Sequence, residues 1–245
     1  MFAFRDSLEA TSTTPRVDVA FTEPLPIVTD VGQARTTVLA GLATSTGRTP
    51  FVMHQVHGAE VHVVGDEDVV DDPVLCVDAL ATTRRDVVLM ARAADCVPLL
   101  LASPEGAIGA VHAGRRGLAL GVVPAAVGRL RSLGAAQLTA WVGPHICGRC
   151  YEVPEQMQEK VAALVPEARS TTSWGTPSLD LGAGVRSQLA AEGVGDIRVV
   201  DACTREDDRW PSFRRDGDAA LRFAGLVWLA PSDVMDAAGP NRQIS

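Results

Sequence analysis

The sequence predicts a mixed α/β protein built as a sandwich of layers, with more strands than helices. Apolar, strand-like runs often follow one another directly, whereas a doubly wound sheet alternates strands with helices. Neither a Gly-rich dinucleotide fingerprint nor a P-loop is found. No internal repeat or linker divides the 245 residues, so we expect a single domain over residues 1–245 that ends in a loose tail at 231–245.

The first part of the chain contains mainly strand patterns. Val17, Val19 and Phe21 alternate with polar or small residues, which is typical of a strand with one buried face. The pattern at 31–42 is weakly helical, and the acidic stretch 65–73 is expected to be a solvated loop. Further strands are expected at 51–56, 60–64 and 86–91.

Residues 94–117 hold the most informative stretch. One apolar run follows Cys96 and another ends at His112, and the turn signal Ser103-Pro104-Glu105-Gly106 separates them. We therefore expect a hairpin that brings Cys96 close to His112. Arg115 and Arg116 follow at the point where the expected strand ends and the expected helix begins. A helix N-terminus is a position that favours anions.

The second half alternates helices and strands. Apolar residues at helical spacing predict a helix over 118–133, with Gly134 as its C-cap. Pro154 suits the first turn of a helix that ends near 164, and Asp180 can cap another that ends at Gly193. The Ser- and Thr-rich stretch 170–178 is expected to be a loop. Strands are expected at 138–142, 197–201 and 225–230.

Composition excludes several classes of protein. A formal net charge of −8 argues against non-specific binding to nucleic acid or to anionic membranes. Five cysteines, an odd number in a chain of this length, argue against a disulfide framework. The N-terminus lacks a signal-peptide pattern, and no apolar stretch reaches the roughly 18 residues of a membrane span. We expect a cytoplasmic protein.

Three residues at expected strand ends are candidate metal ligands: His57, Cys96 and His112. Their separations of 39 and 16 residues do not match a zinc finger but suit a site assembled from three strand ends. Three protein ligands leave a fourth position for water, as in catalytic zinc sites. The alternative, which the spacing leaves open, is a buried cysteine and two ordinary polar histidines.

Other candidates lie elsewhere in the chain. Cys147-Gly148-Arg149-Cys150 is a single CxxC that could be redox-active or half of a zinc site, but the sequence offers no second pair of ligands, so local packing is the favoured interpretation. Asp95, beside Cys96, is a candidate general acid or base or a group that orients a ligand, with an ordinary turn or cap carboxylate as the alternative. Phe213 followed by Arg214 and Arg215 could stack a ring and hold a phosphate or carboxylate, with a solvated charged turn as the alternative.

These segments together resemble the laccase-domain family, long labelled multicopper polyphenol oxidases and now treated as purine nucleoside phosphorylases. The likeness covers about residues 50–230. The motifs that carry it, in family order, are Gln55-Val56-His57-Gly58, Asp78-Ala79-Leu80, Ala94-Asp95-Cys96-Val97-Pro98, His112-Ala113-Gly114-Arg115-Arg116-Gly117, Gly143-Pro144, Cys150-Tyr151-Glu152-Val153, Cys203-Thr204 and Phe213-Arg214-Arg215-Asp216-Gly217.

The resemblance implies an α/β/β/α sandwich related to toxin deamidases, and one zinc ion held by His57, Cys96 and His112. It implies phosphorolysis of adenosine, inosine or guanosine to the base and ribose 1-phosphate, with methylthioadenosine phosphorolysis and adenosine deamination as further activities. The partners would be a nucleoside and phosphate, in a monomer or a dimer. Catalytic roles are expected for Asp95, Arg116 and Cys150, and substrate-binding roles for Gln55, Arg116, Phe213 and Arg215.

The chain departs from the family at Arg115, where the family usually has Trp. This change affects packing beside the site but removes no expected ligand. Two alternatives remain: a copper-dependent polyphenol oxidase, and a non-catalytic zinc protein. Only five histidines are present, which makes a cluster of several copper ions hard to build.

Overall fold

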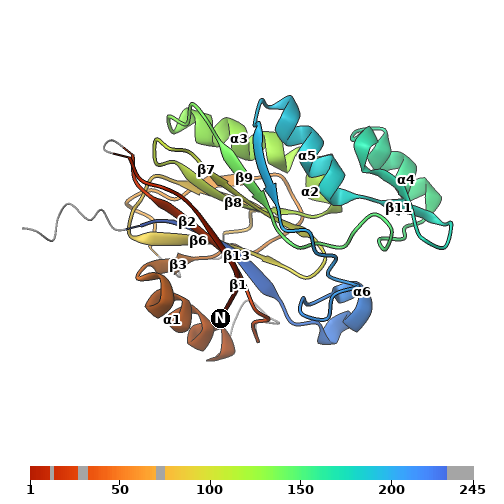
Figure 1. Ribbon diagram of the computed structural model, residues 1–245, viewed down its shortest axis with the longest axis horizontal. Coiled ribbons are helices and arrows are strands. Elements are labelled where there is room, and N and C mark those ends of the chain that lie inside the picture. The colour runs from red at the N-terminus through yellow and green to blue at the C-terminus, as the bar shows by residue number, and fades with distance from the viewer. Residues whose placement is uncertain (12–13, 27–32, 70–74, 231–245) are drawn as a thin grey trace, which may run out of the picture.

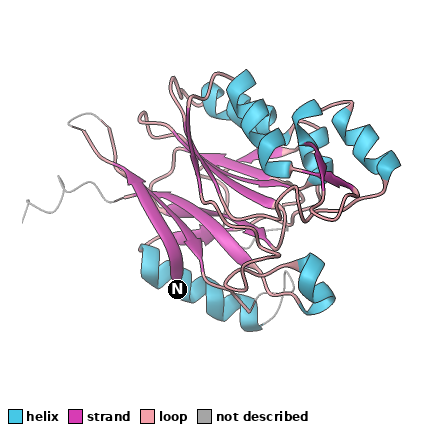
Figure 2. Cartoon of the chain, turned by 45° about the vertical axis from the view of Figure 1, so that its right-hand side comes forward, coloured by secondary structure: helices cyan, strands magenta, loops and turns pink. Residues whose placement is uncertain are grey.

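The computed structural model describes residues 1–11, 14–26, 33–69 and 75–230. Two β-sheets lie face to face between two layers of helices, as Figures 1 and 2 show. This is the α/β/β/α sandwich that the resemblance implies. Within the described ranges, the helices are all too short or too polar to cross a membrane.

The first sheet has five strands and is antiparallel except at one edge, where β3 pairs with β6 in parallel. Its strands β2 and β13 are buried along their whole length, so β2 is buried on both faces, whereas its alternation predicts one buried face only. In spatial order the strands are β1 (Phe2–Leu8), β2 (Val17–Thr22), β13 (Phe223–Leu229), β6 (Val87–Ala93) and β3 (Thr49–Phe51).

The second sheet has six strands and contains the predicted hairpin. Its strands β7 and β8 pair antiparallel, with Pro98 opposite His112, which confirms that expectation. The outer pairs β12–β9 and β4–β5 are parallel. In spatial order the strands are β12 (Asp196–Val199), β9 (Thr139–Val142), β7 (Val97–Ala102), β8 (Ile108–Ala113), β5 (Ala79–Thr82) and β4 (Val61–Val63).

Three apolar cores follow from this layering. Leu100 of β7 faces the first sheet, whereas its neighbours Leu99 and Leu101 face the helices that cover the second sheet. The third core lies between the outer face of the first sheet and α1. The helices are α1 (Gln33–Thr46), α2 (Arg115–Ala119), α3 (Val122–Ser132), α4 (Glu155–Ala162), α5 (Leu181–Ala191) and α6 (Phe213–Asp216).

Most predicted elements are present, with shifted ends, but the single helix predicted over 118–133 is divided into α2 and α3, with Gly121 in a left-handed conformation between them. Asp180 caps α5 as predicted, since its side chain accepts a hydrogen bond from Ala183 N. The loop expected at 170–178 is instead a short hairpin of β10 (Arg169–Thr171) and β11 (Pro177–Leu179), so that prediction was wrong. Some predictions fall outside the described residues. These are the tail at 231–245, the start of the helix predicted over 31–42, and the end of the acidic loop predicted over 65–73.

Candidate functional site

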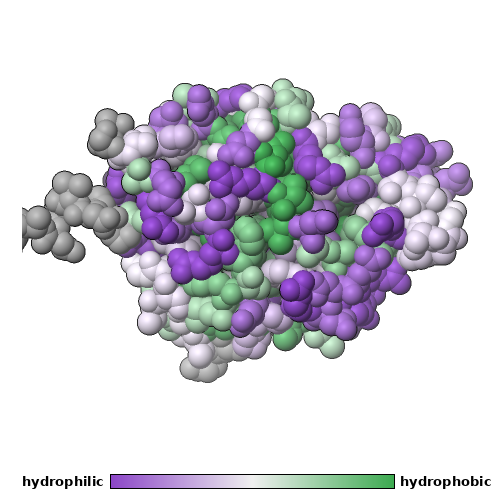
Figure 3. All heavy atoms as spheres, in the orientation of Figure 1, coloured by the Kyte–Doolittle hydropathy of each residue, from purple (hydrophilic) through white to green (hydrophobic). Residues whose placement is uncertain are grey.

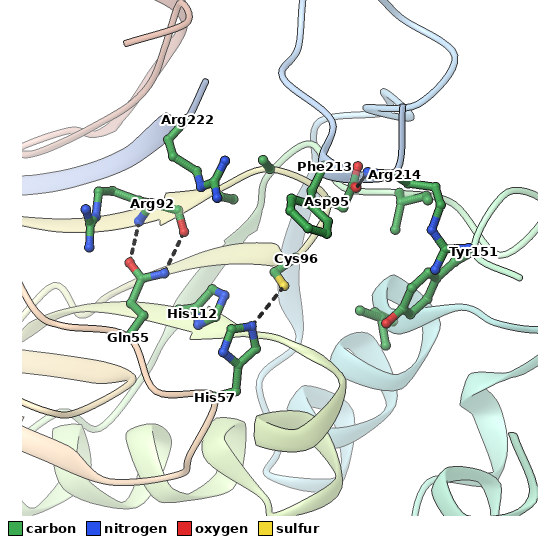
Figure 4. Close-up of a pocket in the computed structure, with 14 residues that line it drawn as sticks. Gln55, His57, Arg92, Asp95, Cys96, His112, Tyr151, Phe213, Arg214 and Arg222 are labelled. Atoms are coloured by element: carbon green, nitrogen blue, oxygen red, sulfur yellow. Dashed lines mark hydrogen bonds between the residues drawn. The ribbon is translucent and has the colours of Figure 1, made fainter. Parts of the chain in front are cut away.

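The three predicted metal ligands lie together. One possible ligand atom from each of His57, Cys96 and His112 lies within 4.8 Å of the others. The Cys96 Sγ is 3.9 Å from His57 Nε2, and the two imidazole rings meet edge to face with their centroids 4.8 Å apart. Figure 4 shows the three side chains converging on the wall of one pocket.

Each ligand comes from a different piece of the fold. His112 lies near the C-terminal end of β8, and Cys96 directly precedes β7, the strand that pairs with β8. His57 lies in the loop that follows β3 of the other sheet, with a left-handed φ of 60°. A non-glycine residue in this region is uncommon and is retained only where the surroundings enforce it.

Asp78 holds the backbone around His57 and the ring of His112 in place. The sequence alone predicted no role in the site for this residue. Its carboxylate is fully buried and accepts hydrogen bonds from the backbone N–H groups of Val56, His57 and Gly58, at 3.2, 2.9 and 2.6 Å. It also lies 2.8 Å from His112 Nδ1. That contact leaves Nε2 of His112 for a metal, the usual arrangement of a carboxylate behind a ligating histidine. Burial raises the pKa of Asp78, but the hydrogen bonds from His112 and the backbone outweigh burial and hold it below its ordinary value.

The thiol and the imidazole at this site are electrostatically paired. Burial would raise the pKa of Cys96, but His112 and His57 lower it to about 6. Burial would lower the pKa of His112, but Cys96 and Asp78 raise it to about 9. The pairing thus favours the thiolate form of Cys96, the form that binds a metal, and metal binding would release the proton from His112.

Gly114 has no side chain, and this leaves space for the side chains of the three ligands. A Cβ atom at this position would lie 2.7 Å from His57 Cδ2 and 3.2 Å from Cys96 Sγ. The residues present fit a metal ion: two imidazole nitrogens and one thiolate converge, one histidine is held by a carboxylate, and the backbone beside them carries no side chain. A His₂Cys set suits zinc, and it is also found in copper sites.

The pocket above these ligands has a volume of about 500 Å³. Phe213 and Tyr151 lie on one side of the ligands and Arg222 on another, as Figure 4 shows. The Arg214 guanidinium lies 5.1 Å from the centre of the Tyr151 ring. Burial, and then the nearby Cys96, raise the pKa of Tyr151, so its hydroxyl is a hydrogen-bond donor at neutral pH. The pocket thus offers aromatic surface, guanidinium groups and a hydroxyl around a metal-binding set.

Asp95 lines this pocket and holds two of its walls. Its Oδ1 accepts a hydrogen bond from Thr204 Oγ1 at 2.6 Å, and its Oδ2 accepts one from Arg214 N at 2.6 Å. Its backbone oxygen accepts a third from Ile146 N at 3.0 Å. The φ of Asp95 is 92°, so this residue too has an uncommon backbone conformation. These bonds fix the segment that carries Phe213.

The other predicted site residues are distributed as follows. Gln55 lines the pocket, and its amide bonds the backbone N–H and carbonyl of Arg92, both at 2.8 Å. Arg116 is exposed near the start of α2, and neither it nor Arg215 belongs to the pocket lining. The Arg215 guanidinium instead donates to the carbonyls of Thr204 and Trp210, at 2.8 and 3.0 Å.

Cys150 lies in a second cluster. One ligand atom each of Cys147, Cys150, Cys203 and Glu206 lies within 4.8 Å of the others. The inference that Cys147 lacks further ligand partners was therefore wrong, because the chain brings Cys203 and Glu206 beside the CxxC from more than 50 residues away. Burial, and then a hydrogen bond with Glu206, raise the pKa of the Cys150 thiol, which is the opposite of what activates a nucleophilic thiol.

On the face shown in Figure 3, hydrophobic residues gather near the centre, and hydrophilic residues lie on both sides of them. All five cysteines are free thiols.

Comparison with known proteins identifies the family. Purine nucleoside phosphorylase SCO2081 of Streptomyces coelicolor is 52% identical over 180 residues, which are 72% of this chain and 74% of that protein. Purine nucleoside phosphorylase Rv2149c of Mycobacterium tuberculosis is 40% identical over 209 residues, 83% of this chain and 80% of that one. The crystal structure of YlmD from Geobacillus stearothermophilus has a TM-score of 0.77 at 26% identity and covers 91% of this chain and 98% of its own. The family model described as multi-copper polyphenol oxidoreductase laccase matches residues 28–230, and the chain belongs to that family.

Proposed function

We propose that this protein is a zinc-dependent purine nucleoside phosphorylase. The observation that carries the proposal is the His57, Cys96 and His112 set at the wall of a pocket lined with aromatic and guanidinium groups. The names of the relatives that are 52% and 40% identical support the same activity. The substrates would be adenosine, inosine and guanosine, with methylthioadenosine as a further one.

The reaction exchanges one bond at the sugar for another. The bond between C1′ of the ribose and the purine nitrogen breaks, a bond between C1′ and a phosphate oxygen forms, and the purine leaves with a proton on its ring. A zinc ion held by the three ligands would supply a Lewis acid and would lower the pKa of bound water to about 7. That chemistry also suits deamination of adenosine, which replaces the 6-amino group by oxygen from water and which we include in the proposal.

The pocket residues would bind the two substrates. Phe213, half of whose surface is exposed, offers a face on which a purine can stack. Tyr151 would donate a hydrogen bond to the departing base. Arg214 and Arg222 line the same cavity and supply the positive charge that a phosphate requires in a protein of net charge −8. Asp95 would keep the Phe213–Arg214 segment in place.

Metal reconstitution tests this proposal against the oxidase alternative. The purified protein is stripped with a chelator, reloaded with zinc or copper, and assayed for purine release from inosine and for oxidation of a phenol. We expect the zinc form to release hypoxanthine and the copper form to oxidise phenols poorly. Tyr151→Phe should slow purine release at least tenfold while leaving the zinc content unchanged. Phenol oxidation by the copper form, together with an inactive zinc form, would refute the proposal.

A further inference from the structure

The cluster of Cys147, Cys150, Cys203 and Glu206 lies apart from the pocket described above. The cavity beside it, of about 340 Å³, is lined by Cys147, Cys203 and Glu206 among others. Within the part of the chain that the structure describes, this cavity and the nucleoside pocket have no lining residue in common. The cluster therefore needs its own explanation.

Two tight turns supply the four side chains in matched pairs. In the first turn the N–H of Cys150 donates to the carbonyl of Cys147 at 2.9 Å, and in the second the N–H of Glu206 donates to the carbonyl of Cys203 at 3.1 Å. Each turn thus presents ligands three residues apart on one side. The combined pattern is C-x2-C from one segment and C-x2-E from another, which is the pairing of short ligand turns found in structural zinc sites.

The atoms that could bind a cation already converge. The Cys150 Sγ is 3.3 Å from Glu206 Oε1, and the Cys147 Sγ is 4.0 Å from Glu206 Oε2. The backbone N–H of Cys147 donates to the Cys203 sulfur at 3.3 Å, a contact that stabilises a ligating thiolate. Three thiolates and one carboxylate would fill a tetrahedral shell without water.

Charge around the cluster is consistent with a bound cation. With its three thiols deprotonated on metal binding, the cluster would carry four negative charges, which a divalent ion would reduce to two. Arg149 extends its guanidinium to within 3.8 Å of Glu206 Oε2, and Arg205 donates to the carbonyl of Cys150 at 3.2 Å. We propose that Cys147, Cys150, Cys203 and Glu206 form a second, structural metal site that binds zinc.

Such a site would join two segments that form the nucleoside pocket. The segment around Cys147 and Cys150 continues directly into Tyr151, and the segment that starts at Cys203 leads to Phe213. A metal ion bound by both turns would hold these two pocket walls at a fixed separation. The role assigned is structural, because all four positions of the shell are occupied by protein.

Metal counting on the folded protein tests the proposal. Native mass spectrometry and elemental analysis of wild type should find two zinc ions per chain. Cys96→Ser should keep one, and Cys147→Ser/Cys203→Ser should keep one. Cys76→Ser is the matched control, since Cys76 is an exposed cysteine outside both clusters, and it should keep two. A wild-type protein with one zinc that only Cys96→Ser removes would overturn the second site and leave the first intact.

Cobalt substitution supplies a readout that does not depend on activity. Thiolate-to-cobalt absorption grows with the number of sulfur ligands, so Cys96→Ser should retain most of it and Cys147→Ser/Cys203→Ser should lose most of it. If the double variant does not fold, Glu206→Gln tests the same shell, because Glu206 is exposed and its loss spares all thiols. We expect Glu206→Gln to bind the second zinc at least tenfold more weakly than wild type in competition with a chelator. A wild-type protein that instead carries a disulfide among Cys147, Cys150 and Cys203, detected as the loss of two hydrogens in mass, would contradict the proposal.

Discussion

Asp78 and His112 share a buried contact of 2.8 Å between a carboxylate oxygen and Nδ1, and the same carboxylate accepts three backbone N–H groups from the loop that carries His57. One side chain therefore orients the ring of one candidate ligand and the backbone of another. His112 lies on β8 of the second sheet and His57 in the loop that connects β3 of the first sheet to β4 of the second, so Asp78 ties this connecting loop to the second sheet at the site.

The first prediction concerns this carboxylate. Asp78→Asn should weaken metal binding by about 10- to 100-fold, the usual effect of losing a carboxylate behind a ligating histidine. An asparagine has one acceptor oxygen in place of two and cannot accept all four contacts. Affinity is measured by competition with a coloured chelator.

A control for this variant exists on the surface. Asp68 lies 3.0 Å from His62 Nε2 and is not part of either ligand cluster. Asp68→Asn should leave metal affinity unchanged. Equal affinities for Asp78→Asn and Asp68→Asn would show that Asp78 does not support the site.

The second prediction tests the space beside the ligands. Gly114→Ala should reduce metal content and activity by more than tenfold, because its methyl group would lie 2.7 Å from His57 Cδ2. Gly128→Ala is the matched control: it lies in α3, and a Cβ there meets nothing within 4 Å. The control should keep its metal and gain up to about 1 kcal/mol in the free energy of unfolding. A fully metallated, active Gly114→Ala would mean that the ligands do not need this gap.

The third prediction separates two locations for phosphate. The sequence suggests Arg116, whereas the pocket is lined by Arg222. We expect Arg222→Ala to raise the KM for phosphate at least tenfold, since a charge-assisted contact to an anion is lost. Arg116→Ala, outside the lining, should change it less than threefold. Steady-state kinetics at varied phosphate distinguish them, and the reverse ranking would place the anion at the start of α2.

The fourth prediction concerns stability at acid pH. Asp6 of β1 accepts hydrogen bonds from Trp141 of β9 and Arg198 of β12, both at 2.7 Å, and so ties the two sheets together. Burial raises the pKa of Asp6, but these hydrogen bonds lower it below its ordinary 3.8. A carboxyl whose pKa is lower in the folded state stabilises the protein above its unfolded pKa and loses that effect as pH falls through the folded value.

Asp6→Asn should therefore unfold about 1 kcal/mol more easily at pH 7, and this difference from wild type should shrink as the pH falls below the ordinary pKa of 3.8 and through the lower folded-state pKa. Urea titrations at pH 7, 5 and 3 measure this difference. Asp66→Asn, an exposed carboxylate, serves as the control. A difference between Asp6→Asn and wild type that grows as the pH falls would contradict the assignment.

The sequence was informative wherever the evidence was local. The turn at Ser103 to Gly106 predicts the β7–β8 hairpin, and the hairpin alone places Cys96 beside His112. His57 was a candidate ligand from its place at an expected strand end, and the family resemblance favoured that role over an ordinary polar histidine. No local pattern encodes its approach to Cys96 and His112, because His57 lies in a loop after a strand of the other sheet.

Long-range relationships were the ones that local patterns missed. Asp78 reads as an ordinary polar residue before a strand, and its four contacts appear only when two loops meet. Cys147 and Cys203 are 56 residues apart, so their spacing says nothing about proximity. The edge strand β1 was also missed, since its partly exposed pattern is less apolar than that of its neighbour β2.

The central claim is that this chain transfers the ribosyl group of a purine nucleoside to phosphate at the His57, Cys96 and His112 site, and one measurement tests it most directly. Zinc-loaded wild type and Cys96→Ser are incubated with inosine, with and without phosphate, while phosphorus NMR follows the sugar phosphate and chromatography follows the base. The account predicts equal amounts of hypoxanthine and ribose 1-phosphate from wild type, formed only with phosphate, and at least a hundredfold less from Cys96→Ser. Hypoxanthine released without phosphate, or no release by the zinc-loaded wild type, would contradict it.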